Sequence, residues 1–182
     1  MSTIIGIDPG PVSSAFVTLA NGALVHWQIQ KNDDLRIFLR SGVATADAVA
    51  IEVMQGYGMP VGGEVLTTQL WAGRFIEAYS EWGDMLQVTR TAVKGNLCRS
   101  GSGGDDNVRA ALIERFGGTS VAIGGKKCRA CKAAKTKMKS CVVCDGTGLE
   151  SPKGALHGMT GSDVWSALAI AITAFDKQRS TT

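Results

Sequence analysis

Two pairs of closely spaced cysteines place the strongest constraint on how this chain folds. Cys128-x-x-Cys131 is followed, after nine residues, by Cys141-x-x-Cys144. A CxxC turn brings two thiolates to one side of a loop, and two such turns form the tetrahedral S4 site that zinc prefers. Because metal binding supplies folding energy, the spacing predicts a zinc-stabilised insertion at about residues 125–150. Two redox-active CxxC motifs, or four unrelated buried thiols, fit the lysine-rich surroundings less well.

The same segment holds the positive charge of the molecule. Between Lys126 and Lys139 lie seven basic residues and no acid: Lys126, Lys127, Arg129, Lys132, Lys135, Lys137 and Lys139. The other 168 residues carry 12 basic and 16 acidic side chains, a net charge of −4. So compact a basic cluster indicates a polyanionic partner. The alternative is a solvated cluster that only aids solubility.

Length and composition indicate a globular protein. A chain of 182 residues is long enough for one ordinary domain with an insertion, so we expect a single domain over residues 1–182. A hydrophobic content of 45% excludes a disordered chain, and no apolar run has the length of a membrane span. The first residues contain no secretory signal, and the odd cysteine count favours a reducing compartment. Cys98 is expected to be an ordinary buried or half-buried thiol.

The apolar pattern predicts an α/β domain with a mixed sheet. Short β-branched or apolar runs predict strands at Thr3–Asp8, Ser14–Ala20, Ala23–Gln30, Ala48–Val53, Met85–Thr89 and Thr119–Ile123. Helical spacing predicts helices at Asp33–Arg40, Glu64–Trp82 and about Ser162–Lys177. In the second of these, the apolar positions at helical spacing are Leu66, Leu70, Gly73, Ile76 and Tyr79. A further helix, capped by Asp105 or Asp106, is predicted to carry Val108, Leu112, Ile113 and Phe116. Asn21-Gly22 is a strong hairpin signal.

Three acids stand at the ends of elements that otherwise belong to the core. Asp8 ends Ile4-Ile-Gly-Ile7, Glu52 lies between Ile51 and Val53, and Asp163 opens an apolar helix. Burying an unpaired carboxylate costs roughly several kcal/mol, so convergence on a divalent cation explains the three together. Each has a simpler explanation when taken singly: a bond to turn amides for Asp8, an ion pair with a lysine for Glu52, and helix N-terminal preference for Asp163.

These motifs resemble the RuvC family of Holliday junction resolvases, in the RNase H-like superfamily. The resemblance rests on Ile5-Gly-Ile-Asp-Pro-Gly10, the acid of Ile51-Glu-Val53, and Gly161-Ser-Asp-Val-Trp-Ser-Ala-Leu-Ala-Ile-Ala171. Val93-Lys-Gly-Asn followed by Asp105-Asp-Asn-Val-Arg is also similar to that family. The chain looks closest to the phage-borne branch. The resemblance covers residues 1–120 and 154–176 and leaves the cysteine insertion without a counterpart.

The resemblance implies an RNase H-like fold with a mixed five-stranded sheet flanked by helices. It also implies that Asp8, Glu52 and Asp163 bind Mg2+, or Mn2+, for two-metal hydrolysis of a phosphodiester. Hard oxygen ligands suit these ions, whereas the thiolates select zinc. The family's fourth acid would fall at Ser166, so the second ligand set is open. The candidates are Ser166, which would ligate through water, and His157, Asp105 and Asp106. Each also has a simpler explanation: Ser166 as an ordinary hydroxyl, His157 as a loop residue, and Asp105 and Asp106 as solvated charges beside a helix.

DNA contacts are expected at two places. In the resembled family an aromatic on the loop after the second acid stacks against bases, and Tyr57 is the candidate here; it could equally pack back on its own loop. Lys132, Lys135, Lys137 and Lys139 would grip a DNA arm through its phosphates. The aromatic and small residues of the helix at 64–82 suit a homodimer interface, although core packing explains part of that composition.

We therefore expect a dimeric, Mg2+-dependent endonuclease that resolves four-way and other branched DNA. The expected location is the cytoplasm, which would be that of the bacterial host if a phage encodes the protein. The alternatives are an RNase H-like nuclease for hybrid or flap substrates, a non-catalytic zinc-ribbon nucleic-acid binder, and an actin-like nucleotide-binding protein. The zinc-ribbon binder would leave the three acids unexplained. The actin-like protein would need a second phosphate loop and roughly twice the length.

Overall fold

The computed structural model describes residues 2–42, 46–56, 58, 60–99, 103–134, 141–144 and 147–180. The chain forms two compact units, one from residues 1–108 with 160–182 and the other from residues 109–159. The prediction that residues 1–182 form a single nuclease domain stays a prediction. In the described part of the chain, no helix combines the length and apolarity needed to cross a membrane.

The first unit is built on a mixed five-stranded sheet. Its strands are β1 (Thr3–Asp8), β2 (Ser13–Ala20), β3 (Ala23–Lys31), β4 (Ala48–Glu52) and β5 (Met85–Val88), in the order β3-β2-β1-β4-β5. The first three strands are antiparallel, whereas β4 runs parallel to β1 and β5 parallel to β4. The hairpin turn has positive φ at both Asn21 and Gly22 (51° and 81°), which matches the right-handed twist of the strands that it joins.

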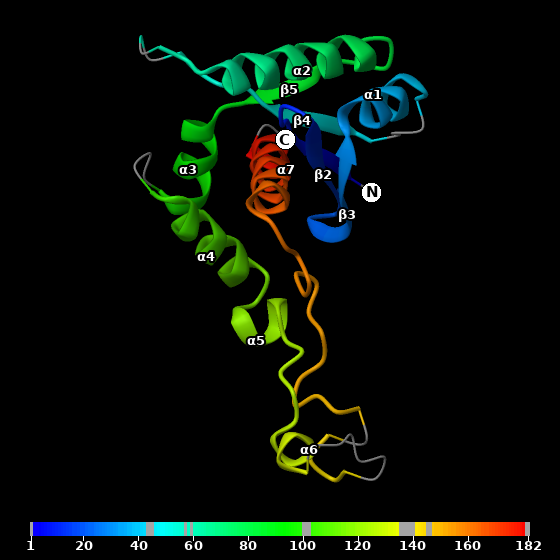
Figure 1. Ribbon diagram of the computed structural model, residues 1–182, viewed down its shortest axis with the longest axis vertical. Helices are drawn as coiled ribbons and strands as arrows, with labels where there is room; N and C mark the ends of the chain where they lie inside the picture. The colour runs from blue at the N-terminus through cyan, green and yellow to red at the C-terminus, as the bar shows by residue number, and fades with distance from the viewer. Residues whose placement is uncertain are drawn as a thin grey trace. The chain divides into compact units, whose positions relative to one another are not determined.

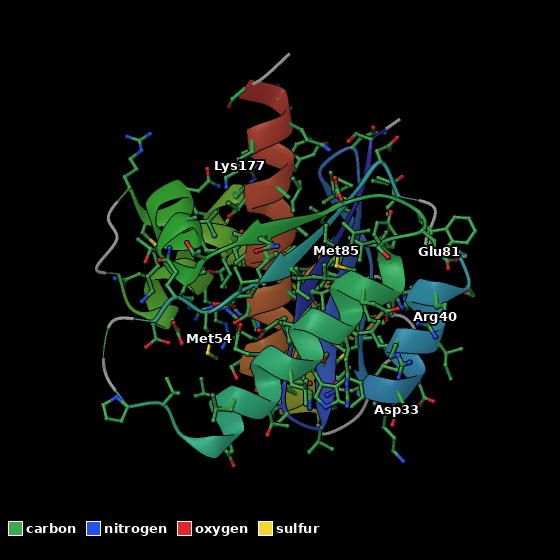
Figure 2. The ribbon with its side chains drawn as sticks, turned by 90° about the horizontal axis from the view of Figure 1, so that it is seen from above. Asp33, Arg40, Met54, Glu81, Met85 and Lys177 are labelled. Atoms are coloured by element: carbon green, nitrogen blue, oxygen red, sulfur yellow. The ribbon has the colours of Figure 1, made fainter. Side chains whose placement is uncertain are left out.

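Helices cover both faces of this sheet (Figures 1 and 2). On one face lie α1 (Asn32–Arg40) and α2 (Gly63–Tyr79), and on the other lies α7 (Ser162–Ser180). The core under α1 and α2 joins side chains from both helices to those of the sheet: Ile5, Ile7, Phe16, Leu35, Leu39, Val49, Ile51, Ala72, Phe75, Ala78, Tyr79 and Met85. These strands and helices follow the predicted boundaries closely.

A glycine in the central strand lets α7 pack directly against the sheet. A Cβ on Gly6 would lie 2.4 Å from the carbonyl oxygen of Ala167 and 2.7 Å from the Cβ of Ala171. Only glycine permits so close an approach of helix and strand backbones. The contact fixes α7 along β1, with Ala167 one turn after Asp163 and Gly6 two residues before Asp8.

The face of α2 that is buried differs from the face that the spacing of Leu66 and Leu70 predicted. Leu66 and Leu70 are 58% and 55% exposed, and Tyr79 is the predicted position that is buried. The residues that face the core are Thr68, Ala72, Phe75, Ala78 and Tyr79. The small side chains Thr68, Ala72 and Ala78 on this face let the helix lie close to the sheet, so the side that carries Leu66 and Leu70 faces solvent.

Two segments after β5 depart from the predicted elements. Arg90–Cys98 forms helix α3, which no pattern predicted, and Thr119–Ala122 forms the short helix α5 where a strand was predicted. The strand prediction was wrong because Gly117 and Gly118 take positive φ (98° and 80°) and reverse the chain after helix α4 (Asp105–Arg115). The amide of Ala122 then bonds to the Gly118 carbonyl at 2.8 Å, which closes a helical turn.

The second unit contains α5, α6 (Arg129–Ala133) and the four cysteines. Two antiparallel bridges, Gly124 with Lys153 and Lys127 with Leu149, hold together the two chain segments that lead into and out of the cysteine region. The amide of Cys128 also bonds to the Gly148 carbonyl at 3.0 Å. In the described residues of this unit, secondary structure is short, and the cysteines form a hydrophobic cluster of their own.

Candidate active site and metal centre

The carboxyl ends of two adjacent parallel strands bring Asp8 and Glu52 together. Asp8 is the last residue of β1 and Glu52 the last of β4, and Ile7 pairs with Ile51 in the register of these strands. Ligands of open α/β sheets bind at this edge, where the strand order changes direction. Both residues are partly buried.

Asp163 reaches the same place from the other face of the sheet. It is in the first turn of α7, the helix that Gly6 holds against β1. Its carboxylate oxygen Oδ1 accepts a hydrogen bond of 2.8 Å from the hydroxyl of Ser162. Asp163 is exposed, unlike Asp8 and Glu52, so its position at a helix N-terminus carries little burial cost.

The three predicted carboxylates line one cavity of about 240 Å³. The cavity is lined mainly by polar side chains from strand ends and helix starts: Asp8, Pro9, Glu52, Met54, Thr68, Gln69, Arg90, Asp105, Ser162, Asp163 and Ser166. Two of the four candidates for a fourth ligand, Asp105 and Ser166, are therefore at the site. Asp106 and His157 are not among its lining residues.

Crowding of the carboxylates changes their protonation. Burial raises the pKa of Asp8 to about 8, with repulsion from Glu52 and Asp163 adding to the rise and Arg90 opposing it. Burial also raises the pKa of Glu52, against the attraction of Arg90. A hydrogen bond between the two carboxyl groups also raises the pKa of Asp8 and lowers that of Glu52.

Such a group of carboxylates fits a hard divalent cation. Mg2+ and Mn2+ bind carboxylate oxygens, and a bound cation would offset the repulsion among these carboxylates. The oxygens of the three acids are not all within 4.8 Å of one another: among the described residues, the four cysteines are the group that meets this spacing. Metal binding by Asp8, Glu52 and Asp163 stays a prediction, and their convergence on one cavity is its structural support.

Arg90 is a site residue that the sequence reading missed. It is the first residue of α3, two residues after the end of β5, and Thr89 caps that helix by accepting a bond of 3.2 Å from the Ala92 amide. Its guanidinium lies 3.8 Å from Glu52 Oε2, donates to Ser166 Oγ at 3.1 Å and pairs with Asp105. The signal that could have indicated it is a charged residue near the carboxyl end of a parallel strand, where Asp8 and Glu52 also lie.

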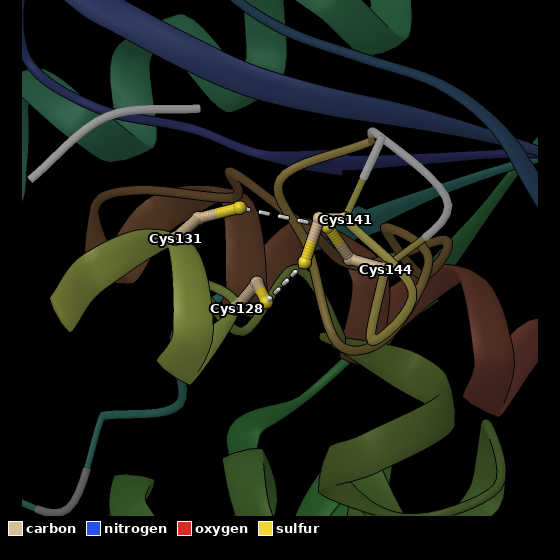
Figure 3. A group of neighbouring side chains, drawn as sticks. All are labelled: Cys128, Cys131, Cys141 and Cys144. Atoms are coloured by element: carbon tan, nitrogen blue, oxygen red, sulfur yellow. Dashed lines mark hydrogen bonds between the residues drawn. The ribbon is translucent and has the colours of Figure 1, made fainter. Parts of the chain in front are cut away.

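The four cysteines have the spacing of a tetrahedral thiolate site (Figure 3). Cys128 and Cys141 have their sulfurs 3.8 Å apart, and Cys131 and Cys144 have theirs 3.7 Å apart. A zinc tetrahedron with bonds of about 2.3 Å has sulfur–sulfur edges of about 3.8 Å. A disulfide would need about 2.05 Å. The predicted cluster before the last helix is therefore present, with all four residues buried and dimensions that fit zinc.

The backbone around Cys144 favours its thiolate. Burial acts to raise the pKa of Cys144, but the Gly148 amide, which donates to its sulfur at 3.2 Å, and the other three cysteines outweigh this effect. The resulting pKa of about 7 lies below the ordinary value of 9.0. Since the thiolate is the form that binds metal, this cluster is prepared for a cation.

The basic segment is less uniformly positive than its sequence suggests. Glu150 accepts from the Arg129 side chain at 2.9 Å and lies 4.0 Å from the Lys126 ammonium, so two of the seven charges have a partner. Lys132 is exposed. The other predicted DNA contacts, Tyr57, Lys135, Lys137 and Lys139, lie outside the described residues, and all five stay predictions.

His157 has a structural role within the second unit. Its Nδ1 lies 3.0 Å from the carbonyl oxygen of Ile123, and a Cβ on Gly125 would lie 2.4 Å from its ring. The histidine thus packs against the turn at Gly125, which takes a positive φ of 68°. This position supports the simpler reading, in which His157 stabilises a loop.

Comparison with solved structures identifies the fold. A structure of Thermus thermophilus RuvC matches with a TM-score of 0.63 and 17% identity, covering 98% of this chain and 97% of that one. T. thermophilus RuvC in complex with a Holliday junction substrate matches with a TM-score of 0.62 and 19% identity, covering 100% and 98%. No protein-family model and no curated protein matches the sequence. The predicted RNase H-like fold, and the resemblance to RuvC at the level of the fold, are confirmed.

Proposed function

We propose that this protein is a metal-dependent endonuclease that cuts branched DNA, chiefly four-way junctions. The observation that carries the proposal is the convergence of Asp8, Glu52 and Asp163 on one cavity at the carboxyl ends of β1 and β4. The shared fold of a RuvC protein solved with a Holliday junction substrate supports DNA junctions as the substrate class.

The reaction would be hydrolysis of a phosphodiester. A water oxygen forms a bond to phosphorus while the bond from phosphorus to the 3′ oxygen breaks. The water loses one proton to a base, the leaving oxygen gains one, and the net change is the addition of one water molecule. Bound Mg2+ or Mn2+ would supply Lewis-acid stabilisation of the phosphate and a more acidic water. Asp8, Glu52 and Asp163 would hold the ion and orient the water.

The four cysteines would hold a structural zinc ion with no open coordination position. Buried thiols with sulfur–sulfur distances of 3.7 and 3.8 Å support this assignment. Zinc would stabilise the second unit, whose described elements are short. The exposed Lys132, with the predicted Lys135, Lys137 and Lys139, would contact DNA phosphates without reading sequence.

A homodimer would place two such sites on one symmetric junction. Support comes from α2 and the residues around it, where Val61, Leu66, Leu70 and Trp82 are all more than half exposed. Exposed apolar side chains of this size on and beside one helix favour a protein partner, and a two-fold axis suits a four-way substrate.

The direct test is cleavage of a labelled substrate panel. Four-way junction, linear duplex, flap and RNA–DNA hybrid are incubated with the purified chain in Mg2+, in Mn2+, or with neither. We expect paired nicks in the junction and dependence on the added ion. Preference for hybrid or flap would assign another RNase H-like substrate. Binding without cleavage of any substrate would favour a non-catalytic nucleic-acid binder instead.

A further inference from the structure

The side chains that could complete a second metal site in the cavity are already bound to Arg90. Its guanidinium donates to Ser166 Oγ at 3.1 Å and pairs with Asp105, and it also lies 3.8 Å from Glu52. Two-metal sites hold both ions about 3.5–4 Å apart with shared and separate carboxylates. Residue 166 of this chain is a serine, and its hydroxyl oxygen accepts a hydrogen bond from the Arg90 guanidinium.

The guanidinium is held firmly. Its backbone starts α3 under the Thr89 cap, and its side chain is 30% exposed, while that of Glu52 is 15% exposed. Arginine stays charged at any pH that the folded protein tolerates, and the surrounding carboxylates raise its pKa further, against the effect of burial. A permanent positive charge therefore stands beside Asp8 and Glu52.

Arginine is also suited to a phosphate. Its five donors form a planar fork that matches phosphate oxygens, and the named bonds to Ser166 and Asp105 occupy two of them. Because Arg90 lines the same cavity as the three predicted metal ligands, a phosphate bound in that cavity would have both the carboxylates and the guanidinium around it.

We propose that Arg90 takes the place of a second divalent ion, so that the site holds one ion and uses the guanidinium to bind the scissile phosphate. This inference rests on the proposed nuclease function and makes it more specific. Asp8, Glu52 and Asp163 would hold the ion, which would make the attacking water more acidic, and Arg90 would stabilise the negative charge that develops on the phosphate and its leaving oxygen.

Counting bound Mn2+ separates this inference from the function itself. The free ion is measured by electron paramagnetic resonance, without DNA, on the full zinc-loaded chain. We expect one Mn2+ per chain in the wild type and in Ser166→Asp, where the new carboxylate pairs with Arg90. The double variant Arg90→Ala, Ser166→Asp should bind two. The inference would be overturned if the wild type bound two Mn2+ ions per chain. It would also be overturned if the double variant bound one ion while its melting temperature matched that of the wild type. No bound ion in any variant would overturn the proposed metal site as well.

Cleavage rates test the phosphate contact. Arg90→Gln should lower kcat by about 10²-fold with an unchanged Mn2+ count, as loss of one preorganised donor does elsewhere. Arg90→Lys should restore part of that loss, because it returns the charge without the fork. Arg40→Gln is the matched control, since Arg40 also pairs with a carboxylate, Glu77 at 2.8 Å, and is not a lining residue of the cavity. A wild-type kcat in Arg90→Gln would refute the role.

Discussion

Asp8 and Glu52 are neighbours because β1 and β4 are parallel and end together, so folding forces two carboxylates into contact. Burial, with repulsion from Glu52 and Asp163 added to it, raises the pKa of Asp8 to about 8, so this carboxyl group keeps its proton to a higher pH than an ordinary aspartic acid does. A divalent ion would displace that proton. Binding of the ion should therefore be tighter at high pH than at low pH.

Neutral replacements of the acids should stop cleavage and spare DNA binding. We expect Asp8→Asn, Glu52→Gln and Asp163→Asn each to lower the cleavage rate by roughly 10³-fold or more, because each removes a ligand of an ion that supplies several kcal/mol. Junction affinity, measured by anisotropy in Ca2+, should stay near that of the wild type. Asp106→Asn, a change next to Asp105 but outside the cavity lining, is the control. An Asp8→Asn protein that cuts normally would refute the site.

The raised pKa of Asp8 predicts a pH-dependent stability. Its folded-state pKa of about 8 lies above the ordinary 3.8, so the folded chain binds this proton more tightly than the unfolded chain. The stability that this proton provides is fully present below about pH 4 and is lost as pH rises toward 8. With zinc bound and no Mg2+, Asp8→Asn should melt higher than the wild type at pH 8 by roughly 3 °C or more. The two melting curves should converge near pH 4. A gap that widens on acidification would contradict this account.

At the scale of elements, the strands of the sheet were predictable because their apolar runs are continuous and their ends carry turn residues. Helix α3 was not, since Val93 is its one fully buried residue and the Thr89 cap, a local bond, helps to start it. Arg90 was missed with it. The leucines of α2 predicted the wrong buried face, because the small residues Ala72 and Ala78 pack against the sheet in place of Leu66 and Leu70.

In the candidate site, too, some residues were predictable from the sequence and others were not. Asp8 and Glu52 could be found because an acid at the end of an apolar strand is costly unless it has a partner. Nothing in the spacing of the sequence places Asp105 beside Arg90, because these residues are 15 apart and belong to different helices, α4 and α3. The cysteine cluster was fully predictable, since short CxxC spacings bring thiols together without help from distant elements.

The cysteine cluster should be the structural determinant of the second unit. Cys144→Ser should lower bound zinc well below about one ion per chain, since three thiolates and a hydroxyl bind zinc more weakly. Limited proteolysis should then cut within residues 109–159 and leave a folded remainder with its own sheet core. Cys98→Ser is the matched control, because this half-buried thiol is outside the cluster. Full zinc occupancy in Cys144→Ser, measured by elemental analysis, would contradict the assignment.

Helix α2 should mediate self-association. Leu70→Glu places a charge on an apolar face that is 55% exposed in the single chain, so it should raise the dimer dissociation constant at least about tenfold. Val25→Glu is the control, because it makes the same kind of change, apolar to acidic, at a 60% exposed position on β3 instead of α2. Sedimentation velocity gives both values. Equal effects of the two variants, or a monomeric wild type at high concentration, would exclude α2 as the interface.

At the scale of the whole molecule, charge and stabilisation are divided between different parts of the chain. Residues 126–139 carry seven basic side chains, while the rest of the sequence has a net charge of −4. The first unit has a sheet with an apolar core, and the second unit has the four thiols. A chain with this distribution would approach a polyanion through one short segment, because the remainder repels it.

That segment should set the salt dependence of DNA binding. Replacing Lys132, Lys135, Lys137 and Lys139 with glutamine should weaken binding to junction and duplex alike, since phosphate contacts carry no sequence information. The slope of log affinity against log salt should fall by up to about 0.9 for each lysine that contacts a phosphate. Lys126 and Arg129 already pair with Glu150, so replacing these two with glutamine should change the slope less and serves as the control. Affinity is measured by anisotropy from low to high salt, in Ca2+ to prevent cleavage. An unchanged slope in the four-lysine variant would mean that the segment does not touch DNA and that its charge serves solubility.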